Sequence, residues 1–187
     1  MAEQNNWSDE VLMQRIQSGE RKYFELLFDR YQHRLFNFML RFVRHNEKAE
    51  DLLQDLFIKV MESPEKFNAQ KKFSTWIYTL AINLCRNDIR NSNNRQRIVE
   101  TDFQPEKSFH PNHHEQFDQR NFKRELNALL ETMDEENKTI LLLRFYEELT
   151  IPEISAIVLL PEGTVKSRLF YLLKKLATQL HAYNPAT

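Results

Sequence analysis

"LTIPEISAIVLLPEGTVKSRLFYLLKKL", which runs from Leu149 to Leu176, decides the fold of the C-terminal part of this 187-residue chain. Thr150 and Glu153 have the spacing of a capping box, so a helix is expected to begin here. A break at Leu159 to Pro161 leads to a second helix, whose apolar residues recur at helical spacing: Val165, Leu169, Leu172, Leu173 and Leu176. Two helices joined by so short a turn predict a helix-turn-helix.

The composition of the whole chain also favours helices. It contains two glycines among 187 residues, whereas a share of about 7% is usual and hairpins depend on glycine turns. No apolar run approaches the roughly 18 residues of a membrane span, and the N-terminus lacks the basic and apolar regions of a secretory signal. The single Cys85 excludes an internal disulfide and fits a reducing compartment. We therefore expect an all-α, cytoplasmic protein without membrane insertion of its own.

A polar stretch divides the chain into two modules. Residues 98–119 carry five acidic residues against one lysine, contain two prolines and show no helical apolar period. We predict a flexible linker there, between a helical domain at residues 1–97 and a second at residues 120–187 that contains the helix-turn-helix. The linker holds three histidines without a nearby cysteine, so no metal site is predicted at His110, His113 and His114.

Apolar spacing predicts the helices of the first module. It indicates helices over residues 8–18 and 47–61, with a near-helical run between them. Ser74 is expected to cap a further helix that contains Trp76. Trp76 fits a place in the core as well as one on the surface.

Two clusters of cations stand out against a net charge of −1. Four arginines lie within residues 86–97, opposed only by Asp88, and no acid interrupts the cations between Gly163 and Leu176. Backbone N–H groups and the dipole at a helix N-terminus favour phosphates, and Lys and Arg reach phosphates or base edges. Gly163 would permit close approach of a neighbour. For this helix taken alone, a solvated basic face is the simpler interpretation.

Three segments in order carry a resemblance to a known family. "AEDLLQDLFIKV", "KFSTWIYTLAINLCRNDIR" and the opening stretch together resemble a bacterial RNA polymerase sigma factor of the extracytoplasmic-function (ECF) type, the two-domain minimal form. The resemblance covers about residues 23–180. It implies a protein that binds core RNA polymerase, directs it to a promoter and helps to open the duplex.

The resemblance also implies roles by position. In such factors the "DLLQDLF" helix docks on a coiled coil of the large polymerase subunit, which points to Asp51, Leu52, Gln54 and Asp55. The following loop and helix melt and read the minus-ten element, which points to Phe67, Asn68, Lys71, Lys72, Phe73, Trp76, Asn83, Arg86 and Arg90. Aromatic rings and cations suit this task, because unpaired bases stack on rings and phosphates attract positive charge.

The resemblance assigns the last helix to the minus-thirty-five element in duplex form. It points to Glu162, Thr164, Lys166, Ser167 and Arg168. Arg168 is the favoured candidate for bidentate recognition of a base. The chain departs from the family at the turn, where Leu159 stands at the usual glycine and Ser155 at a common alanine. Because a β-carbon costs energy in a left-handed turn, a different turn geometry is expected.

Two other classes of protein remain open from the residues. One is a free-standing helix-turn-helix regulator that binds an operator as a dimer, and the other is an interaction module whose basic faces bind acidic partners. No glycine-rich phosphate loop and no recognisable Ser, His and Asp arrangement occurs, so neither an enzyme nor a cofactor is predicted. The expected partners are core RNA polymerase and promoter DNA. The resemblance adds an anti-sigma factor, although no residue identifies one.

Overall fold

The structure, a computed structural model, describes residues 7–98, 130 and 132–181. Its contacts divide the chain into two compact units, Met1–Val99 and Glu100–Thr187. Every regular element in the described residues is helical, which confirms the prediction of an all-α fold. None of the helices in this part of the chain is long and apolar enough to cross a membrane.

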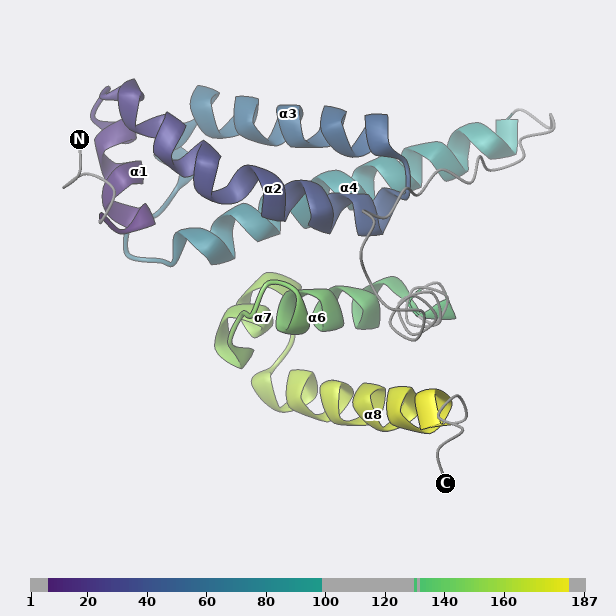
Figure 1. Ribbon diagram of the computed structural model, residues 1–187. Helices are drawn as coiled ribbons and strands as arrows, with labels where there is room; N and C mark the ends of the chain where they lie inside the picture. Colours follow the sequence, from purple (N-terminus) through teal and green to yellow (C-terminus); the bar gives the residue numbers. More distant parts are fainter. Residues whose placement is uncertain (1–6, 99–129, 131, 182–187) are drawn as a thin grey trace, which may run out of the picture. The chain divides into compact units, whose positions relative to one another are not determined.

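The first unit is a helical bundle (Figure 1). Its elements are α1 (Asp9–Gln17), η2 (Arg21–Tyr23), α2 (Phe24–Val43), α3 (Asn46–Glu62), η3 (Pro64–Lys66) and α4 (Phe73–Ile98). Helices α2, α3 and α4 pack side by side, and α1 packs at the end of the bundle where α2 and α4 begin (Figure 1). The short α1 therefore lies next to the segment that joins α3 to α4.

Apolar residues at helical spacing build the core of this bundle. The fully buried members include Leu35, Phe38 and Met39 from α2, Leu56 from α3, and Phe73, Ile77, Tyr78, Ala81 and Cys85 from α4. Each large apolar side chain buried in this way stabilises the fold by about 1.5–3 kcal/mol relative to an exposed one. The expected helices over residues 8–18 and 47–61 are confirmed to within one residue at each end.

The start of α4 differs from the prediction. The helix begins at Phe73, so Ser74 lies inside its first turn and is not the cap. Instead, the carboxylate of Glu10 on α1 accepts a hydrogen bond from the backbone N–H of Phe73 at 3.0 Å. The packing of α1 thus supplies from a distant part of the chain what a local serine was expected to supply.

The second unit contains the helix-turn-helix. Its described helices are α6 (Glu135–Phe145), α7 (Ile151–Val158) and α8 (Glu162–His181), and each packs against the other two. Asp134 caps α6 by accepting from the N–H of Asn137. Glu153 accepts from the N–H of Thr150 at the start of α7, as the capping-box spacing predicts. The predicted linker beyond Ile98, with its three histidines, lies outside the described residues.

The turn between α7 and α8 corrects one expectation. Leu159 has φ 58° and ψ 38°, so it adopts the left-handed conformation in spite of its β-carbon. The Ser155 hydroxyl donates to the carbonyl of Leu160 at 2.5 Å, and the N–H of Leu160 donates back to the carbonyl of Ser155 at 3.3 Å. This additional hydrogen bond offsets part of the roughly 1–2 kcal/mol that the left-handed conformation costs. The turn therefore keeps its geometry without glycine.

Candidate nucleic-acid and protein interfaces

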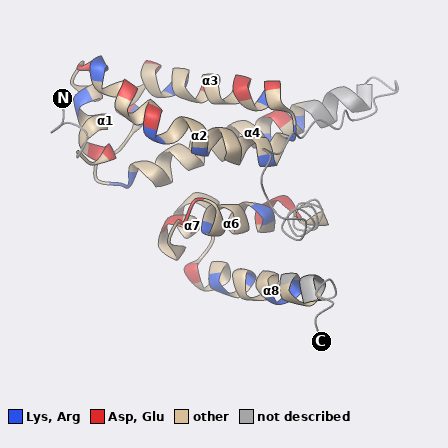
Figure 2. Cartoon of the chain, in the orientation of Figure 1, with Lys and Arg blue, Asp and Glu red and all other residues tan. Residues whose placement is uncertain are grey.

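The α3 outer face contains three of the four residues predicted to bind polymerase. Asp51, Gln54 and Asp55 are exposed, and their spacing of three and four residues places them together on the helix. Leu52, the fourth, is 6% exposed and packs into the core beneath them. Figure 2 shows the acidic residues of α3 in red. The structure thus separates three contact candidates from one supporting residue.

Ile58 is a further member of the α3 outer face that the sequence interpretation missed. It lies seven residues after Asp51, two helical turns along the same face, and is 52% exposed. Its spacing from Asp51, Gln54 and Asp55 was visible in the sequence and was the available signal. An exposed isoleucine among acidic and amide side chains provides apolar area for a protein contact.

The segment between α3 and α4 contains predicted DNA contacts of two kinds, which are exposed polar residues and aromatic residues. Asn68, Lys71 and Lys72 are exposed. A short local turn orders them, because the Asn68 side chain accepts from the N–H of Gln70 at 2.9 Å and its carbonyl accepts from the N–H of Lys71 at 2.9 Å. We call residues 68–72 the reading loop.

The aromatic residues on either side of this turn are not equally accessible. Phe67 is 3% exposed and Phe73 is fully buried, which differs from the expectation that both rings face an unpaired strand. Their ring centroids lie 5.6 Å apart, and the ring of Trp76 lies 5.3 Å from Phe67 and 5.8 Å from Phe73. Trp76 is only partly buried and covers the cluster. The two phenylalanines gain more from packing with each other than from contact with solvent.

The predicted DNA-facing side of α4 continues from Trp76. Asn83 and Arg90 are exposed and Arg86 is half-buried, and all three follow Trp76 at helical spacing. The acidic Asp88 between the arginines forms an ion pair with Lys48 of α3, with 3.0 Å between Nζ and Oδ1. This pairing moderates the one negative charge in the arginine cluster, so the outer side of α4 is more positive than its sequence indicates.

In α8, the buried stripe leaves an opposite side that faces solvent. Val165, Leu169 and Leu172 are buried. The α8 outer face consists of Thr164, Ser167, Tyr171 and Lys174, which recur at helical spacing and are exposed except for the half-buried Thr164.

Two aromatic side chains of α8 were not predicted to be functional. Tyr171 is 68% exposed and Phe170 is 63% exposed, and their ring centroids lie 5.5 Å apart. The sequence places Tyr171 seven residues after Thr164, two helical turns along the same face, and this spacing could have identified Tyr171 as a member of the α8 outer face.

The start of α8 also contains two other predicted residues, Glu162 and Lys166, and the neighbouring Gly163. Glu162 and Lys166 are exposed and face each other at 3.9 Å, one turn apart. A β-carbon added at Gly163 would have no heavy atom within 4 Å, so no neighbour in the described chain requires glycine there. The close approach expected from the sequence is therefore not an internal contact.

Arg168 points toward α6 and not toward the α8 outer face. Its guanidinium forms an ion pair with the carboxylate of Glu136. Desolvation works to raise the pKa of the neighbouring Asp134, but hydrogen bonds from Asn137 outweigh it and hold this pKa below its ordinary value. The positive charge of Arg168 lowers the pKa of Asp134 further. Arg168, the favoured base-reading residue, thus joins two helices of its own unit.

Comparison with known proteins places these surfaces in a family. The sequence profile described as "Sigma-70 region 2" matches residues 27–95, and the profile described as "Sigma-70, region 4" matches residues 123–176. The ECF RNA polymerase sigma-E factor of Haemophilus influenzae is 32% identical over 178 residues, which cover 91% of this chain and 93% of that protein. This chain belongs to the ECF sigma factors.

Other similar proteins agree with this assignment. The RNA polymerase sigma-H factor of Pseudomonas aeruginosa is 29% identical to this sigma factor over 170 residues. These residues cover 87% of this chain and 88% of that protein. A solved structure of the sigma factor RpoE of Bartonella quintana, in complex with the anti-sigma factor NepR, has the same fold. It has a TM-score of 0.73 at 21% identity, and the match covers 86% of this chain and 98% of that one.

The family assignment confirms the function predicted from the sequence. The protein is a sigma factor that directs promoter-specific transcription by RNA polymerase. Sigma factors are non-catalytic initiation factors. The matches to region 2 and region 4 occur in chain order, which disfavours a free-standing helix-turn-helix regulator, because such a protein would not need the region 2 bundle.

Proposed function

We propose that this sigma factor uses three separate surfaces to start transcription. The α3 outer face binds core RNA polymerase, the reading loop with the outer side of α4 contacts the minus-ten strand, and the α8 outer face reads the minus-thirty-five duplex. The observation that carries this proposal is the α3 outer face itself, where Asp51, Gln54, Asp55 and Ile58 are exposed opposite the buried stripe of a region 2 helix.

The composition of the α3 outer face supports binding to a protein. Two carboxylates and an amide supply specific polar contacts at the rim, and the side chain of Ile58 supplies apolar area near them. Exposed charges at a rim contribute mainly to the rate and specificity of association, whereas a buried apolar anchor contributes more to affinity. Leu52 supports this face from the core and does not contact polymerase directly.

The surroundings of the reading loop support a contact with a single strand. Asn68, Lys71 and Lys72 offer an amide and two cations at its surface, and Asn83 and Arg90 continue this polar surface along α4. Cations follow a phosphate backbone, and an amide can bond the edge of an unstacked base. Phe67 and Phe73 hold the loop from inside, and Trp76 is the accessible ring on which a base can stack.

The α8 outer face supports reading of duplex DNA. Thr164 and Ser167 lie near the N-terminus of α8, where a helix in the major groove contacts base edges. Tyr171 and Lys174 lie farther along the same face, where a phenol and an ammonium group can reach phosphates. Lys166 serves as a further phosphate contact. Arg168 fixes α8 on α6 and does not read a base.

The proposed partners are core RNA polymerase, promoter DNA and an anti-sigma factor that holds the protein inactive. The resemblance to regulated ECF factors supports this third partner, and no individual residue is assigned to it. The proposed place of action is the cytoplasm, and the proposed mode of action is binding without covalent chemistry.

Replacement of the α3 outer face tests the proposal. The triple variant Asp51→Ala, Gln54→Ala and Asp55→Ala and the single variant Ile58→Ala should co-purify poorly with core polymerase, because each removes exposed groups and leaves the core intact. Glu50→Ala is the matched control, since Glu50 is exposed on another side of α3. Circular dichroism should show unchanged helical content in all variants. Normal co-purification of the triple variant would overturn the assignment of this face.

A further inference from the structure

Helix α1 lies before the region 2 match, which begins at residue 27, yet it contacts the segment that carries the reading loop. Its residues Leu12, Met13 and Ile16 are buried, so one side of the helix belongs to the core. Its polar side chains have long-range partners that a merely space-filling helix would not require.

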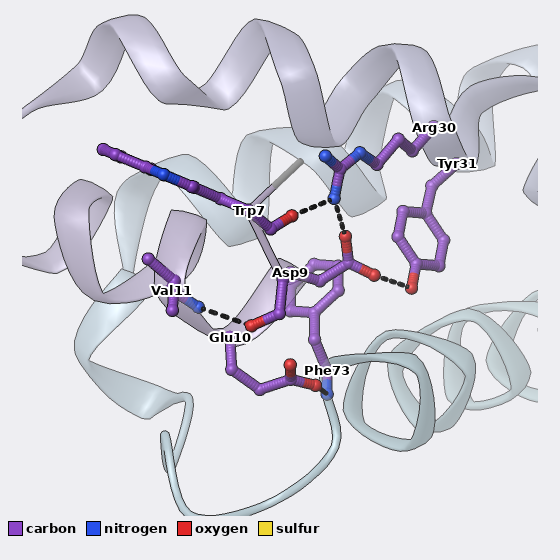
Figure 3. Close-up of polar contacts among 8 residues, drawn as sticks. Trp7, Asp9, Glu10, Val11, Arg30, Tyr31 and Phe73 are labelled. Carbon is purple, nitrogen blue, oxygen red and sulfur yellow. Dashed lines mark hydrogen bonds and ion pairs between the residues drawn. The ribbon is translucent and has the colours of Figure 1, made fainter. Parts of the chain in front are cut away.

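Hydrogen bonds and an ion pair fix the N-terminal end of α1 to α2 (Figure 3). The carboxylate of Asp9 accepts from the guanidinium of Arg30 at 2.6 Å and from the hydroxyl of Tyr31 at 2.5 Å. Arg30 also donates to the backbone carbonyl of Trp7 at 2.8 Å. Charge-assisted bonds of this kind are about twice as strong as neutral ones. Helix α1 is therefore a fixed support.

From this support, two side chains hold the segment on both sides of the reading loop. The amide nitrogen of Gln17 donates to the carbonyls of Pro64 and Phe67, each at 2.8 Å. Glu10 accepts from the backbone N–H of Phe73 at 3.0 Å (Figure 3). Both interactions address backbone atoms, so they fix the path of the chain whatever side chains the loop carries.

The geometry points to α1 as a positioning element for minus-ten recognition, acting through Gln17 and Glu10. This inference rests on the proposed role of the reading loop. Asn68, Lys71 and Lys72 lie between the two attachment points, so their side chains start from a backbone whose ends are held. Holding the loop in its binding shape lowers the entropy that is lost when a strand binds.

The two side chains allow substitutions that change chemistry with little change in shape. Gln17→Glu replaces the donating amide by a carboxylate that would face two carbonyl oxygens, so both hydrogen bonds are lost. Gln17→Ala removes the bonds without adding charge. Glu10→Gln keeps an oxygen that can accept from Phe73, whereas Glu10→Ala does not. Gln14→Glu is the matched control, because it makes the same exchange at an exposed position of α1.

The experiment uses full-length protein assembled with core polymerase. Initiation is measured on promoters randomised at the minus-ten element and, separately, at the minus-thirty-five element. Loss of two hydrogen bonds should lower initiation by Gln17→Glu from the preferred promoter about tenfold and reduce its preference among minus-ten sequences. Gln17→Ala and Glu10→Ala should show the same pattern, and Glu10→Gln should restore most of the preference. Selection at the minus-thirty-five element and assembly with polymerase should not change.

The outcomes separate this inference from the proposed function. If wild-type holoenzyme shows no minus-ten preference, the proposed role of the reading loop fails. If wild type has the preference and both Gln17 variants keep it, α1 does not position the loop, even if the variants unfold at lower temperature. If Gln17→Glu does not fold, the result with Gln17→Ala decides. An equal loss with Gln14→Glu would also overturn the inference.

Discussion

Glu136→Gln and Arg168→Ala together test what Arg168 does. Each variant breaks the ion pair between α6 and α8 from one side. If Arg168 positions α8, both variants should weaken binding to all promoter sequences alike. If Arg168 leaves Glu136 to read a base, Glu136→Gln should instead strengthen binding, because it frees the guanidinium.

The exposure of the pair sets the size of the effect. The side chains of Arg168 and Glu136 are 32% and 45% exposed, so solvent screens their attraction. Such pairs contribute about 0.2–1 kcal/mol, which limits the expected weakening to about fivefold. Loss of a bidentate base contact would cost about 1–3 kcal/mol at one base pair, a change of roughly 5- to 150-fold in preference. The two roles therefore predict opposite changes in DNA affinity for Glu136→Gln. For Arg168→Ala, they predict either a uniform loss of affinity or a loss of preference at one base pair.

Competition binding of holoenzyme to promoters randomised at the minus-thirty-five element measures both quantities. The double variant should bind no more weakly than either single variant, since the pair is already broken. Lys166→Ala serves as the comparison, because Lys166 is not paired with Glu136 and its effect should add to that of Glu136→Gln. A loss of preference at a single base pair in Arg168→Ala, or tighter binding by Glu136→Gln, would refute the positioning role.

Three further predictions concern stability and domain organisation. Leu159→Gly should raise the unfolding temperature of the second unit by about 3–6 °C, because it relieves a left-handed β-carbon and loses little packing at a side chain that is 87% exposed; calorimetry that shows no increase would contradict this reasoning. Partial burial works to raise the pKa of Glu10, but backbone hydrogen bonds, above all from Phe73, hold this pKa below its ordinary value. The stability from this depressed pKa is present above the unfolded-state value and lost as the pH falls through the folded-state value, so wild type should exceed Glu10→Gln in urea resistance at pH 7 and lose that advantage in acid. Fluorescence can follow this unit alone, since the two tryptophans, Trp7 and Trp76, both lie in it. Limited proteolysis should cut first within residues 98–119 and leave two helical fragments, whereas first cuts inside helices would argue against a linker.

Local rules were enough to predict most of the described helices. The spacing of apolar residues indicates α1 and α3, and the capping residues Asp134 and Thr150 mark where α6 and α7 begin, because these signals act within one or two helical turns. The same spacing placed Asp51, Gln54 and Asp55 on one face. The family resemblance, in turn, supplied the function proposed for that face.

The remaining features depend on contacts that no local pattern contains. Glu10 meets the start of α4 across 63 residues, and Arg168 meets Glu136 across 32. Burial of Phe67 and Phe73 follows from the way α1, α2 and α4 pack, so the sequence could suggest two aromatic contacts where the structure has two supports. Leu159 shows the opposite limit, since it adopts the left-handed conformation that a sequence rule disfavours, at a cost that one hydroxyl partly offsets.

The scarcity of glycine has a consequence for how long this protein lasts in a cell. Within the described residues, Arg44, Glu148 and Leu159 hold left-handed backbone at φ 55–58°. Two of them lie in the second unit. At a net cost of about 0.5–1 kcal/mol each relative to glycine, the pair raises the unfolded population of that unit roughly 5- to 30-fold. Proteases act on this population, so degradation should begin in the second unit, and the factor's activity should decay quickly once synthesis stops.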